Sequence, residues 1–305
     1  MLTSKRSLIN LSLLLKSDIE LLFGKSLELK LRNSGGQSFT RQPKTAALLF
    51  FEPSTRTRFS FEAACVRAGV HPMIFDGSSG TSLLKGESVF DTILNIEAMR
   101  PLFFIIRCDA TLDLHKIADR VAVPVINAGW GQQGHPTQAL LDILSLFEKW
   151  KSIENRKFLL VGDIKHSRVA QSHFELAKIL KYQIGICAPP ELLPTSIEAN
   201  EAIRFTNLEQ GLEWCDAVMA LRVQKERHDS QLYDINLYRK EYGLNLYNLK
   251  KLSPQAWIMH PGPINYGIEM EQEVLADKRS LILQQVENGV FLREALILNL
   301  LKGMP

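Results

Sequence analysis

The chain has few cysteines, and they are too widely scattered to form a metal site or a disulfide framework. Only four occur in 305 residues, Cys65, Cys108, Cys187 and Cys215, and no Cys-x-x-Cys motif or cysteine–histidine cluster is present. Scattered cysteines in a chain of this size are usually buried thiols in a reducing compartment. We therefore expect no bound metal and a cytoplasmic location.

Long hydrophobic runs are also missing, since no stretch approaches the ~20 apolar residues that span a membrane. The apolar segment 7–15 follows two basic residues and superficially resembles a signal peptide. Asn10 and Ser12 interrupt it, however, and no small-residue cleavage site follows. We expect this segment to lead into a helix capped at Ser17, and we expect no membrane partner.

No block of like charge occurs. Lysine and arginine total 36 against 33 acidic residues, a net charge of +3, and the signs are mixed along the chain. This argues against a nucleic-acid partner and against an acidic solvating arm. Apolar residues make up 46%, which is ordinary for a globular protein. At this length, two domains of roughly 100–200 residues each are expected.

Short apolar runs alternate with helical patterns from about residue 45 onward. The predicted strands are Ala46–Phe51, Pro72–Phe75, Leu102–Ile106, Val123–Asn127, Phe158–Val161, Ile184–Cys187, Ala217–Leu221 and Trp257–Met259. The predicted helices are Thr57–Ala68, Ser88–Met99, Leu112–Arg120, Pro136–Trp150, Ser167–Leu180 and Val290–Leu301. This alternation predicts an α/β fold with parallel-rich sheets flanked by helices, whose ligands bind at the carboxyl ends of strands.

A polar interval, Lys149–Arg156, separates a long helix from a new strand and marks the predicted domain boundary. We expect a first domain over residues 1–149 and a second over 150–288. The apolar C-terminal helix, within 289–305, is expected to pack back on the first domain.

The most informative segment is Phe50–Glu62, Phe-Phe-Glu-Pro-Ser-Thr-Arg-Thr-Arg-Phe-Ser-Phe-Glu. Ser54 is a good helix N-cap, and Arg56 and Arg58 then fall in the first turn, where the helix dipole disfavours positive charge. A bound anion removes the conflict, because free backbone N–H groups, hydroxyls and a guanidinium can converge on a phosphate. The alternative is a plain capping box, Ser54-x-x-Thr57, with solvated arginines.

The motif Phe-x-x-Ser-Thr-Arg-Thr-Arg resembles the carbamoyl-phosphate signature of the aspartate and ornithine carbamoyltransferases. Further segments match the family in order through nearly the whole chain: Ser82–Glu87, Ile106-Arg107, His135-Pro-Thr-Gln138, Gly162–Arg168, Arg222–Arg227 and His260-Pro-Gly-Pro263. The resemblance implies the two-domain carbamoyltransferase fold, no cofactor, and transfer of a carbamoyl group from carbamoyl phosphate to an amine.

The segment Arg222-x-Gln224-x-x-Arg227 favours aspartate as the acceptor, because two cations and an amide suit a substrate with two carboxylates. The ornithine enzymes instead resemble one another in an Asp-containing segment with a Ser-Met pair and in a His-Cys-Leu-Pro loop, and neither occurs here.

The resemblance assigns roles residue by residue. It implies catalytic roles for Arg56, Thr57, Lys85, Arg107 and His135. The implied carbamoyl-phosphate ligands are Ser54, Thr55, Arg56, Thr57, Ser82, Arg107, His135, Gln138, Gly262 and Pro263. The implied aspartate ligands are Lys85, Arg168, Arg222 and Gln224. Without the resemblance, the sequence around Lys85, Arg107 and Arg168 would be interpreted as carrying ordinary solvent-exposed charges.

The resemblance also implies a homotrimer in which Lys85 reaches into the neighbouring subunit's site. Whether a regulatory chain or a dihydroorotase accompanies this chain stays open.

Two other functions compete. Gly129-Trp-Gly-Gln-Gln-Gly134 fits the dinucleotide pattern G-x-G-x-x-G, and Asp163 closes the next predicted strand, which would suit a nicotinamide dehydrogenase. Asp163 lies well beyond the expected spacing of about 20 residues, and His135-Pro136 does not suit a pyrophosphate-binding helix start. A non-catalytic binding protein that keeps the fold is the other alternative.

The chain departs from the family pattern at three places. Trp130 stands where the family usually has an acidic residue, Tyr266 stands where it more often has arginine, and Cys108-Asp109 follows Arg107 in place of a His-Pro type of pair. None of these changes removes a residue assigned to the chemistry.

Overall fold

The structure is a computed structural model that describes residues 7–12, 14–31, 44–77, 86–194, 201–223 and 234–302. The chain divides into two compact units. Unit 1 comprises residues 1–141 and 286–305, and unit 2 comprises residues 142–285.

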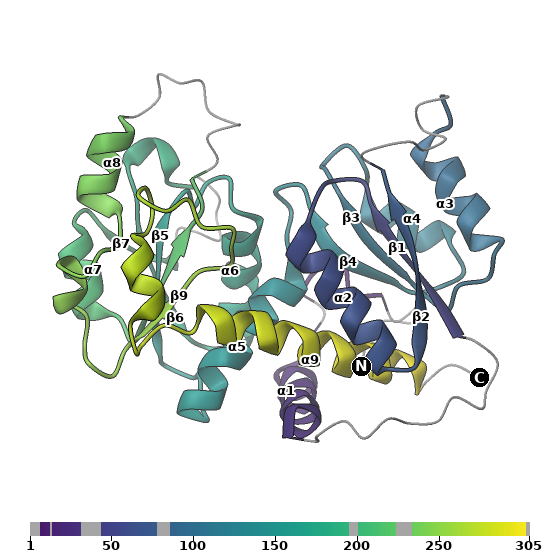
Figure 1. Ribbon diagram of the computed structural model, residues 1–305, viewed down its shortest axis with the longest axis horizontal. Helices are drawn as coiled ribbons and strands as arrows, with labels where there is room; N and C mark the ends of the chain where they lie inside the picture. The colour runs from purple at the N-terminus through teal and green to yellow at the C-terminus, as the bar shows by residue number, and fades with distance from the viewer. Residues whose placement is uncertain are drawn as a thin grey trace. The chain divides into compact units, whose positions relative to one another are not determined.

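Unit 1 is built on a four-stranded parallel sheet in the order β2-β1-β3-β4. Its strands are β1 (Lys44–Phe50), β2 (Val70–Asp76), β3 (Phe104–Cys108) and β4 (Val125–Trp130). The helices that lie wholly in this unit are α1 (Lys16–Leu31), α2 (Thr55–Arg67), α3 (Val89–Glu97) and α4 (Leu114–Arg120). Figure 1 shows α2 on the near side of this sheet.

Both faces of this sheet are covered, which explains why its strands read as unbroken apolar runs. Ala47 and Leu49 of β1 pack with α3 and α4, in a cluster that includes Ile93 and Ile117. The alternate residues of β1 point to the opposite face, and Leu48 among them is also fully buried.

Unit 2 is built on a five-stranded parallel sheet in the order β7-β6-β5-β8-β9. Its strands are β5 (Lys157–Gly162), β6 (Gln183–Cys187), β7 (Ile203–Phe205), β8 (Ala217–Leu221) and β9 (Trp257–Met259). Its helices are α6 (Arg168–Leu180), α7 (Leu208–Trp214) and α8 (Ile235–Tyr242), with short 3₁₀ turns η2 (Pro190–Leu192), η5 (Asn248–Lys250) and η6 (Gln272–Ala276). The core joins Leu159 and Val218 of the sheet to Leu212 of α7 and Leu249 of η5.

Two helices, α5 (Pro136–Trp150) and α9 (Ile282–Leu301), run from one unit into the other. The unit boundary falls between Leu141 and Asp142 on α5, and between Gln285 and Val286 on α9. Each helix therefore contributes a different stretch of residues to each unit.

The α/β fold with two parallel sheets is the one that the strand–helix alternation predicts, so the fold-class prediction is confirmed. Three short elements, β7, α7 and α8, were not predicted, because they are too short for a clear periodicity. Helix α9 begins eight residues before the predicted start at Val290, since polar residues such as Gln284, Gln285 and Asn288 mask its first turns.

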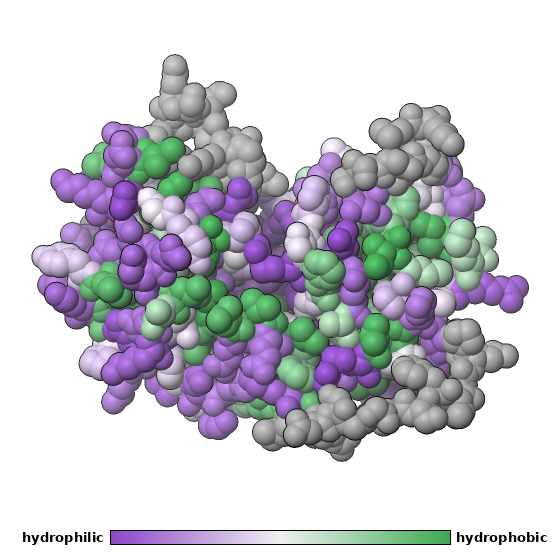
Figure 2. Space-filling view, in the orientation of Figure 1, coloured by the Kyte–Doolittle hydropathy of each residue, from purple (hydrophilic) through white to green (hydrophobic). Residues whose placement is uncertain are grey.

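Within the described ranges, no helix combines the length and the apolar character needed to cross a membrane. In the orientation of Figure 1, hydrophobic side chains appear at the surface in groups interspersed with polar ones (Figure 2). Scattered exposed apolar residues are normal for a globular protein.

Candidate functional site

In unit 1 the strand order reverses between β1 and β3, which is where a parallel sheet binds its ligands. Phe50, the last residue of β1, lies beside Arg107 of β3. The amide of Phe51 donates to the Arg107 carbonyl at 2.9 Å, which fixes the start of the loop that leads to α2. The first turn of α2 therefore follows directly from this edge of the sheet.

The first turn of α2 has the features of an anion site. Ser54 is the N-cap, in an extended conformation, and its side chain accepts no hydrogen bond from the helix. The capping-box alternative is therefore wrong for this helix. The turn contains no acidic residue, Arg56 is exposed, and Thr57 is buried. The turn thus contains backbone donors, hydroxyls and a guanidinium, the groups that bind a phosphate at a helix start, and no carboxylate.

The second arginine of the motif has a different role. Arg58 contacts Asp76 at the end of β2 (Nη1 to Oδ2, 2.9 Å) and Glu62 one turn along α2 (Nε to Oε1, 3.3 Å). Its guanidinium also lies over the Phe59 ring at 5.3 Å. Arg58 is therefore engaged by carboxylates of its own unit.

Arg107 is the cation on the central strand. It sits at an irregularity in the β3–β4 pairing, between Ile106 and Cys108. Its Nη1 donates to the Ala128 carbonyl at 3.4 Å, and its Nε lies 3.8 Å from Glu52 Oε2. Both contacts are long for hydrogen-bonded groups, and they hold the guanidinium at the carboxyl edge of the sheet.

The segment after β4 positions His135 and Gln138 at the start of α5. His135 is only 4% exposed, and its carbonyl accepts from the Gln138 amide at 3.0 Å. Gln138 is half-buried. Thus an imidazole and a carboxamide lie one turn apart at a helix start, at the carboxyl edge of the same sheet.

The glycine-rich loop before His135 does not have the geometry of a pyrophosphate-binding turn. The amides of Gly131, Gln133 and Gly134 donate to carbonyls of Cys108 or Trp130. A dinucleotide-binding loop needs such amides to face the phosphates. The carboxylate of Asp163 is likewise bound within its own turn, 2.8 Å from His166 Nδ1. These contacts argue against the dehydrogenase alternative.

In unit 2 the strand order reverses between β5 and β8, and two predicted aspartate ligands lie at this edge. Gly162, the last residue of β5, pairs with Leu221, the last of β8, and Arg222 follows immediately. Arg168 is the first residue of α6, whose N-cap Ser167 accepts from the Ala170 amide. As in α2, a first turn without acidic residues carries an arginine.

The loop after β9 contains Gly262 and Pro263, joined by a cis peptide bond. The Gly262 amide donates to Nδ1 of His260 at 2.8 Å. Further along, the side chain of Asn265 donates to the Val223 carbonyl at 3.1 Å. This hydrogen bond connects the loop to the residue that follows Arg222.

Three of the predicted ligands, Ser82, Lys85 and Gln224, lie outside the described residues, as does Arg227. The described ligands form two groups. Unit 1 holds Ser54, Thr55, Arg56, Thr57, Arg107, His135 and Gln138, and unit 2 holds Arg168, Arg222, Gly262 and Pro263.

Comparison with protein families gives two matches that together span most of the chain. Residues 6–148 match "Aspartate/ornithine carbamoyltransferase, carbamoyl-P binding domain", and residues 154–300 match the "Asp/Orn binding domain" of the same enzymes. The chain belongs to the aspartate/ornithine carbamoyltransferase family. The resemblance carried by its motifs is thereby confirmed.

Relatives within the carbamoyltransferase family differ in the acceptor that their names state. The chain is 43% identical over 255 residues to the aspartate carbamoyltransferase catalytic subunit of Myxococcus xanthus, covering 83% of this chain and 86% of that protein. It is similar to a Trypanosoma cruzi aspartate transcarbamoylase solved with carbamoyl phosphate (TM-score 0.85, 26% identity, 96% and 94% covered). It is also similar to the Thermus thermophilus ornithine carbamoyltransferase (TM-score 0.83, 26% identity, 97% and 98% covered).

The departures from the carbamoyltransferase pattern have structural explanations in two cases. The Trp130 indole donates to the Leu112 carbonyl at 2.6 Å and lies edge-on to His115, so it packs within unit 1. Cys108 is buried in the sheet. Tyr266 is 46% exposed, and nothing in the structure explains its presence.

A buried arginine on α9 was missed by the sequence reading. Arg293 is 3% exposed, donates to Ser60 Oγ at 2.6 Å and to Thr137 Oγ1 at 3.3 Å, and lies over the Phe61 ring. It thus joins α2 and α5, the helices whose first turns carry Arg56 and Gln138. No local pattern marks this arginine as buried, because its partners lie on α2 and α5.

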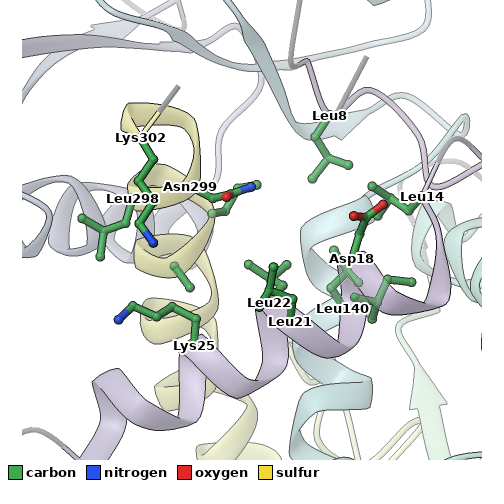
Figure 3. A pocket seen from close by; sticks show the side chains of 13 residues that line it. Leu8, Leu14, Asp18, Leu21, Leu22, Lys25, Leu140, Leu298, Asn299 and Lys302 are labelled. Atoms are coloured by element: carbon green, nitrogen blue, oxygen red, sulfur yellow. The ribbon is translucent and has the colours of Figure 1, made fainter. Parts of the chain in front are cut away.

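The structure also has a cavity of about 130 Å³ in unit 1, lined by α1, α5 and α9. Leu22, Leu140, Lys25 and Lys302 are among the side chains that line it (Figure 3). None of the predicted site residues lines this cavity.

The cysteines of this fold are not suited to act as nucleophiles. All four cysteines are buried, and burial raises the pKa of Cys65 and Cys187 to about 12. Such thiols stay protonated at neutral pH and are poor nucleophiles. Over the described ranges, no group of three or more His, Cys, Asp and Glu side chains is arranged to hold a metal ion.

Proposed function

We propose that the chain transfers the carbamoyl group of carbamoyl phosphate to the α-amino group of L-aspartate. The products are N-carbamoyl-L-aspartate and phosphate. The observation that carries this proposal is an arginine in the first turn of α2 and of α6, each at the switch point of a parallel sheet. Two cationic sites suit one phosphorylated substrate and one dicarboxylate. The aspartate carbamoyltransferases among the relatives at more than 40% identity support the choice of acceptor.

The two domains divide the substrates in this proposal. Residues 1–149 bind carbamoyl phosphate, residues 150–288 bind aspartate, and the helix within 289–305 packs on the first domain. The family matches over 6–148 and 154–300 support a boundary near residue 150. The membership of residues 286–305 in unit 1 supports the packing of the last helix on the first domain.

The phosphate of carbamoyl phosphate is held by the first turn of α2. Ser54, Thr55 and Thr57 supply hydroxyls, the helix supplies backbone donors, and Arg56 supplies a bidentate guanidinium. Arg107 adds a second positive charge from β3, and Ser82 a further hydroxyl. The catalytic contribution is positioning and charge stabilisation, so no activated serine or cysteine is needed.

The carbamoyl group is oriented by donors on one side and acceptors on the other. Thr57, Arg107 and His135 donate to the carbonyl oxygen as negative charge develops on it. The carboxamide oxygen of Gln138 and backbone carbonyls near Gly262 and Pro263 accept from the carbamoyl NH₂.

Aspartate is held by cations of the second domain. Arg168 and Arg222 bind its carboxylates, and Gln224 contributes an amide. Lys85, entering from a neighbouring subunit, lies near both substrates. Reaction begins when the neutral α-amino group attacks the carbamoyl carbon. The new C–N bond forms, the carbon–oxygen bond to phosphate breaks, and the departing phosphate takes the amine proton.

The deciding experiment is a product assay with purified protein, carbamoyl phosphate and either L-aspartate or L-ornithine. We expect carbamoyl aspartate and no citrulline, with no response to NAD or NADH. Citrulline would overturn the choice of acceptor while leaving the phosphate site intact. If neither product forms although the protein binds N-(phosphonacetyl)-L-aspartate, the non-catalytic alternative gains and the proposal fails.

A second prediction concerns the aspartate side. Arg222→Ala removes a cation that binds an aspartate carboxylate, so we expect the KM for aspartate to rise by about 10–100-fold. The KM for carbamoyl phosphate stays within about twofold, since that ligand binds elsewhere. Lys251→Ala is a matched control, because that lysine pairs with Glu209 and Glu213 on the surface. An unchanged aspartate KM in Arg222→Ala would show that the acceptor site lies elsewhere.

We further propose that the chain forms a homotrimer with active sites shared between subunits, and that it acts in the cytoplasm. The role given to Lys85 supports the first proposal. The four buried cysteines, none of them in a disulfide within the described ranges, are compatible with a reducing compartment.

A further inference from the structure

A buried chain of hydrogen bonds in unit 2 connects helix α5 to the loop that carries Gly262. Asp142 Oδ1 accepts from the Gln285 side-chain amide at 2.7 Å. The carbonyl oxygen of the same Gln285 side chain accepts from the backbone amide of His260 at 3.0 Å. His260 Nδ1 then accepts from the Gly262 amide at 2.8 Å. The three bonds together lead from Asp142 to the backbone of the His260–Pro263 loop.

The side chains of this hydrogen-bond chain are shielded from water. Asp142 is fully buried, and Gln285 and His260 are each 2% exposed. A buried polar side chain that loses its partner destabilises the fold, so each bond constrains its neighbours strongly. The orientation of the Gln285 amide is also determined, because its NH₂ must face the carboxylate and its oxygen must face the His260 N–H.

Both ends of the hydrogen-bond chain are fixed by further contacts. Asp142 Oδ2 lies 3.2 Å from His173 Nε2, and His173 Nδ1 lies 2.9 Å from the Tyr182 hydroxyl. Burial, with an added effect of the Asp142 charge, raises the pKa of Tyr182 well above its usual value, so its hydroxyl stays protonated. At the other end, His260 Nε2 lies 3.3 Å from Glu269 Oε1.

The location of the first bond is informative. Asp142 and Gln285 are the first and last residues of unit 2, on the two helices that continue into unit 1. The hydrogen bond between them therefore fixes both helices at the point where each enters the unit. The loop at Gly262 is connected to this bond through one side chain, that of Gln285.

We propose that Gln285, held by Asp142, is a positioning residue for the carbamoyl group. It sets the place of the His260–Pro263 loop, so that the loop carbonyls near Gly262 can accept from the carbamoyl NH₂. The inference rests on the proposed function, which assigns those carbonyls to carbamoyl phosphate. Gln285 itself touches no substrate, and its effect is confined to ligands that carry the amide.

The test exploits the fixed orientation of the Gln285 side chain. Gln285→Glu keeps the side-chain oxygen that accepts from the His260 amide. It replaces the NH₂ group that donates to Asp142 with a second oxygen, so two carboxylates face each other in a buried place. Adding Asp142→Asn restores this hydrogen bond with donor and acceptor exchanged. The NH₂ group at position 142 then donates to the carboxylate at position 285, and the side-chain oxygen at position 142 still faces His173. Asp142→Asn alone keeps an acceptor for Gln285 and provides the background for comparison.

The readout is the affinity for two probes. Phosphonoacetamide, a stable mimic of carbamoyl phosphate, carries both the amide and the phosphonate, whereas inorganic phosphate carries no amide. For Gln285→Glu we expect phosphonoacetamide affinity to fall about tenfold, with phosphate affinity within about twofold of wild type. In the double variant, phosphonoacetamide affinity returns to within about threefold of Asp142→Asn alone.

A control variant lies one residue away. Gln284 donates to Glu148, so Gln284→Glu makes the same chemical change against another carboxylate of α5, without a connection to the loop. We expect it to lower thermal stability and to leave both affinities unchanged. Equal losses for both probes, failure of the double variant to recover, or the same loss in Gln284→Glu would each overturn the proposal.

Binding of the two probes needs no turnover, so this inference and the proposed function fail separately. Absence of carbamoyl aspartate from the wild-type assay counts against the function. Equal loss of affinity for both probes in Gln285→Glu counts against the positioning role of Gln285.

Discussion

Arg56→Ala should lower kcat for carbamoyl aspartate formation by about 10²–10³-fold, the loss that follows removal of one donor that stabilises developing charge. In the proposed mechanism Arg56 binds the phosphate in the ground state and continues to bind it as negative charge moves to the leaving group. We expect Arg56→Ala also to bind inorganic phosphate more weakly, because the guanidinium is one of the proposed phosphate ligands.

The second arginine of the same motif provides a control for Arg56→Ala. Arg58 lies two residues away in the same helix, but it contacts Glu62 and Asp76. Arg58→Ala removes partly exposed ion pairs, each of which contributes about 0–1 kcal/mol, so kcat should stay within about fivefold of wild type. Steady-state rates and thermal melts on both variants test the assignment. Similar losses in the two variants would mean that the motif acts as a general basic patch, and near-wild-type kcat in Arg56→Ala would remove the anion site from α2.

The difference between Arg56 and Arg58 shows where sequence reasoning reached its limit. The arginine in the first turn of α2 led to the prediction of an anion site in this segment, because a positive charge at a helix start is unfavourable whatever the fold. The sequence could not say that Arg58 is engaged by carboxylates of its own unit. That depends on Asp76, which reaches Arg58 only because β2 lies beside β1 in the sheet.

The same reasoning explains which parts of the fold were predictable. Strands buried on both faces read as apolar runs, and the helices between them show an amphipathic pattern, so the parallel sheets could be predicted. Helices α7 and α8 are too short to show a period, although Asn207 and Asp234 cap them with side-chain hydrogen bonds. A capping residue such as Asn or Asp is also common in loops, so its presence before a short segment does not predict a helix.

The buried polar residues of α9 were beyond sequence reasoning for a different reason. Gln285 and Arg293 look like the solvated side of a helix, and each is buried because of partners far away in the chain. Gln285 binds Asp142, and Arg293 binds Ser60 and Thr137. Pairings over such sequence separations are set by how the elements pack, and no local pattern encodes them.

The proposed sharing of active sites predicts that two inactive variants restore each other. Arg56→Ala lacks the phosphate ligand, and Lys85→Ala lacks the lysine given to a neighbouring subunit, so each alone should be nearly inactive. After random exchange of subunits at equal amounts, a site that takes Arg56 from one chain and Lys85 from the next is intact in about a quarter of cases. We therefore expect activity to rise from near zero to about a quarter of the wild-type value.

The control is the double variant Arg56→Ala/Lys85→Ala, mixed in the same way with either single variant. Such mixtures contain no intact site, because no pair of neighbouring chains supplies both residues. Subunit exchange is followed independently with a mass-tagged chain. If exchange is complete and the mixture of single variants stays inactive, Lys85 acts within its own chain, and the sites are not shared through it. If activity recovers in the mixture of single variants and not in the control mixtures, one active site must take Arg56 and Lys85 from two chains, because neither single variant carries both residues.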